Sequence, residues 1–227
     1  MTPDHDPALT YSRYLALDEV LSAQRPLSDE HDELLFIVVH QVYELWFKQL
    51  LHELAHLRAR LQGGDTAHAL HTLKRVLTIL KVVVAQIDVL ETMTPRQFTG
   101  FRARLESSSG FQSVQFRQLE AMVGPPLFGA FLTYLAGQGY RHDGDGDGAV
   151  EEAILAAYRD DGEPAQVAER LVDLDEGLQE WRYRHVKMVE RTIGDKPGTG
   201  GSTGVDYLRR TLFRPAFPHL WAVRSRL

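Results

Sequence analysis

Residues 34–51 read LLFIVVHQVYELWFKQLL, and this stretch decides the class of fold. Its apolar residues lie on nearly every side of an α-helix and do not alternate as they would in a strand. A helix of this kind is buried inside a bundle. Ser28 is expected to cap it, and Gly63-Gly64 to end it.

Helical periodicity continues outward from this stretch along the whole chain. Thr94-Pro95-Arg96-Gln97 has the pattern of a capping box with proline in the first turn, and the helix it opens should end near Leu105. Further helices are expected at about residues 66–90, 111–122, 126–137, 149–160, 164–193 and 204–213. With no alternating run long enough for a sheet, we expect an all-α fold: one domain, residues 1–227, built as a bundle of long helices.

The composition narrows the available chemistry. The chain has no cysteine, which excludes disulfides, thiolate metal sites and a cysteine nucleophile. A net charge of −6 argues against a general nucleic-acid binder. No run approaches the roughly 20 apolar residues of a membrane span, and the N-terminal residues MTPDHDPALT lack the apolar core of a signal peptide. We therefore expect a cytoplasmic protein without a membrane anchor.

The charges are unevenly distributed. Residues 143–180 hold 13 Asp and Glu against two Arg, whereas residues 181–227 hold 10 Lys and Arg against three acids. This asymmetry is typical of solvated helix faces of opposite sign. The alternative is a basic C-terminal region that receives an anionic small molecule.

Two motifs resemble metal sites. His52-Glu53-Leu54-Ala55-His56 fits the zinc-peptidase pattern H-E-x-x-H, but no third ligand follows, and a solvated helix face is the better interpretation. Residues 143–148, DGDGDG, copy the first half of a calcium loop, but Ile154 stands where the bidentate Glu belongs. An acidic mobile turn is the better interpretation there.

Two histidines are predicted to point into the core. Val167, Leu171, Leu174, Leu178, Trp181, His185, Met188 and Thr192 step by four and three residues and so share one helix face. Phe36, His40, Tyr43 and Phe47 form a similar stripe on the first long helix. A lone core histidine is more often a packing residue than a ligand. Two of them among aromatic residues favour a flat apolar cofactor such as haem, held without covalent links because cysteine is absent.

Two further features could bind an anion. Arg102 lies eight residues before Gly110, near a Ser-Ser-Gly turn, and its guanidinium could grip a carboxylate, although an exposed arginine is the simpler interpretation. Residues 198–204, GTGGSTG, could be a linker or a nest of backbone N–H groups. They lack the G-K-[ST] ending of a P-loop, which argues against a nucleotide.

Together these pieces resemble the tryptophan 2,3-dioxygenase family, haem enzymes that open the indole ring of L-tryptophan. The resemblance extends over six ordered blocks along nearly the whole chain: LTYSRY at residues 9–14, DELLFIVVHQ at 32–41 with ELW at 44–46, GFR at 100–102, SSGFQS at 108–113, WRYRH at 181–185 and GTGGS at 198–202.

The resemblance implies a role for each site residue. It implies that His185 is the axial ligand of the iron of haem b, with Ser109, Gly110 and Trp181 also contacting the haem. His40 would meet the indole N–H, and Phe36 and Phe98 would line the substrate site. Arg102 would bind the substrate carboxylate. Thr199 would help to hold the amino-acid head of the substrate, and it lies on a mobile loop over residues 195–204. Tyr11 and Tyr14 would lie on an N-terminal arm, residues 1–25, that reaches a neighbouring subunit of a homotetramer.

The implied activity is insertion of O2 across the indole C2–C3 bond of L-tryptophan, or of a close derivative, to give N-formylkynurenine. This chain differs from the family in having Phe98 where a tyrosine is usual, and the stretch between Gln115 and His185 is short. Three alternatives stay open: a haem monooxygenase on the same scaffold, a haem-binding protein without enzymatic activity and, more distantly, a zinc peptidase that uses His52 and His56.

Overall fold

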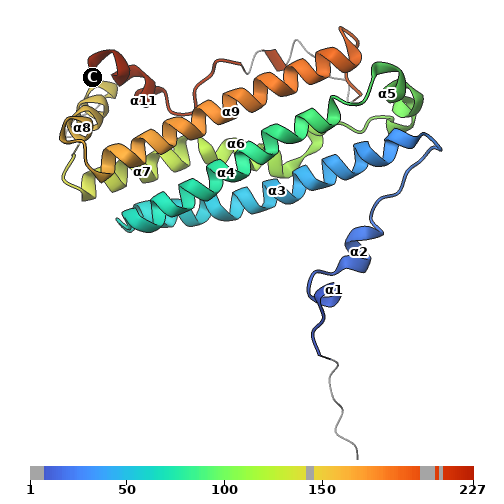
Figure 1. Ribbon diagram of the computed structural model, residues 1–227. Coiled ribbons are helices and arrows are strands. Elements are labelled where there is room, and N and C mark those ends of the chain that lie inside the picture. Colours follow the sequence, from blue (N-terminus) through green and yellow to red (C-terminus); the bar gives the residue numbers. More distant parts are fainter. Residues whose placement is uncertain (1–7, 142–145, 200–207, 210–211) are drawn as a thin grey trace, which may run out of the picture.

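The computed structural model of this protein describes residues 8–141, 146–199, 208–209 and 212–227. Every regular element within these ranges is a helix, which confirms the all-α prediction. Three long helices, α3 (His31–Gln62), α4 (Thr66–Leu90) and α9 (Glu163–Ile193), run side by side along the molecule (Figure 1). Helix α4 lies between the other two and packs on both.

Shorter elements cover the ends and one side of this layer. α5 (Pro95–Arg102) and the 3-10 turn η1 (Ala103–Leu105) lie near the start of α3, while η2 (Gly110–Gln112), α6 (Val114–Val123) and α7 (Pro125–Gly137) follow in the chain. At the opposite end lie α8 (Asp147–Asp160), α11 (Pro218–Ala222) and η3 (Val223–Arg226). The short helices α1 (Tyr11–Tyr14) and α2 (Leu17–Leu21) form an arm that projects away from the bundle (Figure 1).

Two helix starts differ from those predicted. Helix α3 begins at His31, because the N–H and hydroxyl groups of Ser28 both donate to the carboxylate of Glu33, so that Ser28 is not the cap. The helix expected at 111–122 is divided, since the hydroxyl of Ser113 accepts from Phe116 N–H and starts α6 anew. The capping box of Thr94 and Gln97 is confirmed.

The C-terminal region also departs from the predictions. Most of the helix expected over residues 204–213 falls outside the described residues. Helix α11 was not predicted; it is held to α9 by the fully buried carboxylate of Asp175, which accepts from Phe217 N–H at 3.1 Å and Trp221 Nε1 at 2.9 Å. The start of α8 at Asp147 shows that the acidic run 143–148 ends inside a helix, while residues 142–145 lie outside the described part.

Helix α3 is less deeply buried than its composition predicts. Tyr43, Phe47 and Leu50 are buried against the bundle, but Leu34 and Leu45 are 48% and 57% exposed. The expectation of burial on nearly every side is therefore wrong. The reason is that the neighbours of α3 (α4, α5, α6 and α7) leave one side of it open within a single chain.

Two arginines of the basic segment pair with carboxylates of the acidic segment. Arg224 pairs with Glu169, and Arg226 with Glu151 and Glu152, so that the basic end of the chain lies against acidic α8 and α9. Arg184 likewise pairs with Asp88 and Glu91 on α4. These contacts favour opposite-sign helix faces over a free basic region.

Two stretches, His31–Gln62 and Val114–Gly137, reach the length and hydropathy of a membrane span. Neither is the uninterrupted apolar run that the prediction excluded, because Glu44 and Lys48 interrupt the first stretch and Arg117 and Glu120 the second. Core helices of soluble proteins meet the same criterion, and α3, α6 and α7 pack on one another within the bundle, so this is weak evidence for a membrane.

Candidate active site

A cavity of about 580 Å³ opens between α3 and α9 at the end of the bundle that carries α5. Its volume falls within the range of about 300–1,000 Å³ that small-molecule and cofactor sites occupy. The cavity brings together nine of the predicted site residues: Phe36, His40, Phe98, Arg102, Ser109, Gly110, Trp181, His185 and Thr199. Tyr11 and Tyr14 are not among them; both are exposed, on the projecting arm.

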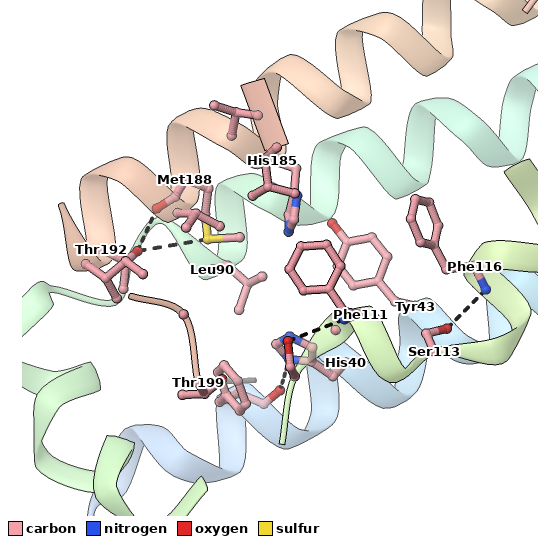
Figure 2. Close-up of a pocket in the computed structure, with 18 of the residues that line it drawn as sticks. His40, Tyr43, Leu90, Phe111, Ser113, Phe116, His185, Met188, Thr192 and Thr199 are labelled. Carbon is pink, nitrogen blue, oxygen red and sulfur yellow. Dashed lines mark hydrogen bonds between the residues drawn. The ribbon is translucent and has the colours of Figure 1, made fainter. Parts of the chain in front are cut away.

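His185 projects into the cavity from α9, where the 4-3 stripe of buried residues reaches the open end of the bundle (Figure 2). Its imidazole has no hydrogen-bond partner among the described residues, and it stacks on Trp181 with ring centroids 6.0 Å apart. Burial lowers the pKa of His185 from 6.5 to about 4, and the proximity of His40 acts in the same direction. The ring is therefore neutral at physiological pH, which is the form that binds a metal ion.

His40 enters the cavity from α3, opposite α9 (Figure 2). Its Nδ1 lies 2.7 Å from the carbonyl oxygen of Phe36. A carbonyl only accepts, so Nδ1 carries the proton, and Nε2 keeps a free lone pair. Burial lowers the pKa of His40, although the Phe36 carbonyl and the charge of Glu44 oppose this. His40 is thus a neutral acceptor in the cavity.

Aromatic rings form the walls beside the two histidines. Phe36 lies 4.1 Å from His40, 5.8 Å from Phe98 and 5.5 Å from Phe101 between ring centroids. Phe98 and Phe101 are buried and make, with Met93, a small core at this end of the bundle. The wall around Phe98 is therefore apolar and has no hydroxyl at that position.

Arg102 is positioned by the close approach of α5 to the start of α3. A Cβ on Gly100 would lie only 2.8 Å from the carboxyl carbon of the exposed Glu30, so a side chain there would displace that carboxylate. Arg102 donates to the carbonyl of Pro197 at 2.6 Å, and Thr199 donates to the carbonyl of Ser108 at 2.5 Å. These two bonds join the start of the predicted loop to the segment after α5. Residues 200–204 of that loop lie outside the described part.

The zinc-peptidase motif does not form a site in this structure. His52 and His56 are exposed, as predicted for a solvated face, but Glu53 is buried and pairs with Arg75 at 3.1 Å, so that prediction is wrong for Glu53. Within the described residues, no group of three or more histidine, aspartate or glutamate side chains could hold a metal ion.

The sequence predictions missed several charged residues that line the cavity: Glu44, Arg117, Glu120 and Arg182. The sequence could have identified two of them, Glu44 and Arg117, as cavity residues. Glu44 is one helical turn after His40, on the same face, and Arg117 follows the SSGFQS block on a helix that covers α3.

Comparison with known proteins identifies the family. The family model for tryptophan 2,3-dioxygenase matches residues 3–127 and 138–227. The chain is 62% identical to the tryptophan 2,3-dioxygenase of Anaeromyxobacter sp. (strain K), with 98% of both chains covered. It is 49% identical to that of Herpetosiphon aurantiacus, covering 97% of this chain and 99% of the relative.

The similarity extends to more distant bacteria. The tryptophan 2,3-dioxygenase of Pseudomonas fluorescens is 38% identical, with 99% of this chain and 93% of the relative covered. The family match is interrupted at residues 128–137, inside the stretch expected to be short, and the Anaeromyxobacter alignment spans 259 positions against the 227 residues of this chain. With this extent of similarity, the chain belongs to the tryptophan 2,3-dioxygenase family.

Proposed function

We propose that this protein is a haem-dependent dioxygenase that inserts O2 across the indole C2–C3 bond of L-tryptophan, or of a close derivative, to give N-formylkynurenine. The observation that carries the proposal is one apolar cavity in which two neutral histidines from different helices are joined by an arginine and a threonine. The two histidines suit haem and an indole ring, and the arginine and threonine suit the carboxylate and ammonium groups of an amino acid.

The residues present fit haem b. The imidazole of His185 makes no hydrogen bond to the described residues, so a ring nitrogen is free and would hold the haem iron, and Trp181, Ser109 and Gly110 line the space around it. The chain has no cysteine, so the haem is held without thioether links. When bound, the haem supplies the site at which O2, the co-substrate, is activated.

His40 orients the substrate. Its Nε2 lone pair accepts the indole N–H, while the bond from Nδ1 to Phe36 holds the ring and its tautomer. The lowered pKa keeps His40 neutral, so it acts as an acceptor and not as a donor. Phe36 and Phe98 provide the apolar wall against which the indole ring packs and keep water away from it.

Arg102 and Thr199 bind the amino-acid head. Only one contact of the Arg102 guanidinium, to Pro197, is made within the described residues, which leaves other N–H donors for the substrate carboxylate. The Thr199 hydroxyl donates to Ser108 and can still accept from the substrate ammonium. Fixing both ends of the substrate is how the protein gains rate by positioning.

The experiment that tests the function is a mass measurement of the product. Haem-loaded protein is given L-tryptophan under isotopically labelled O2, with haem-free protein as the control. We expect both labelled atoms in N-formylkynurenine. A product carrying one labelled atom would favour the haem monooxygenase instead, and no turnover by protein with a full haem complement would favour a haem-binding protein without enzymatic activity.

We also propose a cytoplasmic homotetramer in which Tyr11 and Tyr14 reach a neighbouring subunit. The arm lies off its own bundle, and Leu34 and Leu45 leave an apolar side of α3 uncovered. Both features suit burial by other copies of the chain. Light scattering on the full chain tests the tetramer, and a chain that is monomeric at micromolar concentration would contradict it.

A further inference from the structure

Three arginines line the cavity, Arg102, Arg117 and Arg182, and one of them is paired with a carboxylate. Arg182 pairs with Glu120 at 3.0 Å and also donates to the carbonyl of Arg214. Arg102 donates to Pro197, beside Thr199. Arg117, on α6, likewise donates to a carbonyl, that of Phe111 at 2.5 Å, and forms no ion pair with any described residue; unlike Arg102, it has no part in the proposed substrate contacts.

The two glutamates that line the cavity, Glu44 and Glu120, both interact with residues other than Arg117. Glu44 carries a negative charge next to His40, where Gln115 donates to both its carboxylate and its carbonyl. Glu120 is neutralised by Arg182. Among the described residues, neither Arg102 nor Arg117 has a carboxylate partner; Arg102 is proposed to bind the substrate, which leaves Arg117, exposed at the rim, as the cation without an assigned anion.

Haem b brings two carboxylates, its propionates, on one edge of an otherwise apolar ring. Inside an apolar cavity such charges are costly unless they are paired or reach water. A cation at a solvent-exposed rim meets both needs, and the arginine fork matches a carboxylate. We propose that Arg117 pairs with a haem propionate and thereby sets which edge of the haem faces α6. This inference rests on the proposed haem function.

The test compares two proteins with two ligands. Wild type and Arg117→Leu are each loaded with haem or with haem dimethyl ester, which has no propionate charge, and ligand loss to excess apomyoglobin is timed. We expect Arg117→Leu to lose haem about tenfold faster, the size of one charge-assisted hydrogen bond. Both proteins should lose the dimethyl ester at equal rates.

Two further variants separate charge from packing. Arg117→Lys keeps the charge without the fork and should fall between wild type and Arg117→Leu. Arg96→Leu removes an exposed arginine from α5, outside the cavity, and should lose haem at the wild-type rate. Circular dichroism checks that each variant is folded.

The outcomes distinguish this inference from the proposed function. Equal haem loss from wild type and Arg117→Leu, or an increase that is the same for haem and its ester, overturns the role of Arg117 but leaves haem binding intact. A wild-type protein that binds no haem overturns both. An Arg117 effect in a protein that does not convert tryptophan supports this inference and overturns only the dioxygenase.

Discussion

Helix α9 carries two polar side chains, the buried Asp175 and the half-buried His185, ten residues apart and with opposite surroundings. Asp175, at the closed end of the bundle, is fully buried and accepts hydrogen bonds from Phe217 N–H and Trp221 Nε1. His185, at the cavity end, has no hydrogen-bond partner among the described residues, and burial lowers its pKa to about 4. One helix thus holds a polar group bound to other protein groups and one that faces the cavity.

The difference separates a structural role from a functional one. Nearly all buried polar groups in folded proteins are hydrogen-bonded, because an unpaired one costs about 1–3 kcal/mol. Asp175 follows this rule and fastens α11 to the bundle. His185 instead faces the cavity with no hydrogen-bond partner among the described residues, which favours a partner from outside the chain. Changes to the two residues should therefore affect different properties.

The largest expected effect belongs to His185. His185→Ala should lose nearly all bound haem, more than about 100-fold in affinity, since even residues that only support a metal ligand contribute 10–100-fold. The haem-free protein should be about as stable as the wild type, because His185 makes no hydrogen bond to the described residues and lines an open cavity. Haem content and the Soret spectrum measure the first effect, and His56→Ala, exposed on α3, is the control. Unchanged haem content would refute the axial assignment.

Arg102 is intermediate between Asp175 and His185. It has one hydrogen-bond partner among the described residues, Pro197, and further N–H groups that can donate. Arg102→Leu should lower kcat/KM for L-tryptophan by about 30-fold to several thousand-fold, the range for loss of one partner of a buried charge pair. Wild type should lose a similar factor with tryptamine, which lacks the carboxylate. Arg96→Leu should keep full efficiency. If tryptamine reacts as well as tryptophan, the carboxylate contact does not exist.

Asp175→Ala should act on stability alone. It leaves the Phe217 N–H and the Trp221 indole without their acceptor, which should lower the free energy of unfolding by about 3 kcal/mol. Urea denaturation measures this, and the folded fraction should still bind haem in full. The matched control is Asp173→Ala, whose surface pair with Arg170 should contribute less than about 1 kcal/mol. Equal losses from the two variants would remove the distinction between them.

His40 should show a smaller effect, on turnover and not on haem retention. His40→Ala removes one hydrogen bond to the indole, a loss of about tenfold in kcat/KM. The haem stoichiometry should stay at the wild-type value. A variant of His40 that lost its haem while His185→Ala retained it would show that the two histidines have exchanged roles.

The smallest effect concerns Glu33, a second satisfied carboxylate. Burial alone raises its pKa, but hydrogen bonds from Ser28 and Leu27 outweigh burial and hold the pKa below the ordinary 4.5. The stability it contributes is therefore present above pH 4.5 and is lost as the pH falls through the lower, folded value. Glu33→Gln should flatten the stability curve below pH 4.5 in urea titrations. An unchanged curve would contradict this.

The sequence predicted those features of the fold that depend on interactions between residues close together in the chain. The capping box of Thr94 and Gln97 uses contacts three residues apart, and the stripes that place His40 and His185 follow from helical spacing alone. The start of α3 could not be predicted as well, because Ser28 had two possible partners, its own helix and Glu33, and the second prevails.

Features that depend on distant segments were not predictable from spacing. The bond from Arg102 to Pro197 spans 95 residues, and only the structure shows that their segments meet. Likewise, the periodicity of α3 could not show how many neighbours it would have, so its exposed Leu34 and Leu45 were predicted to be buried. The charges that line the cavity with Arg117 likewise come from separate elements: Glu44 from α3, Glu120 from α6 and Arg182 from α9.

The carboxylate of Asp175 has a consequence for how the chain folds as it is made. Its donors, Phe217 and Trp221, lie 42 and 46 residues later in the sequence. At about 5–20 residues per second, a ribosome needs roughly 2 to 9 seconds to reach them. During that time the first half of α9 has been made but α11 has not, and the side chain of Asp175 remains in water. The closed end of the bundle is therefore completed late in translation, and the nascent chain passes through a stage that exposes apolar surface to chaperones.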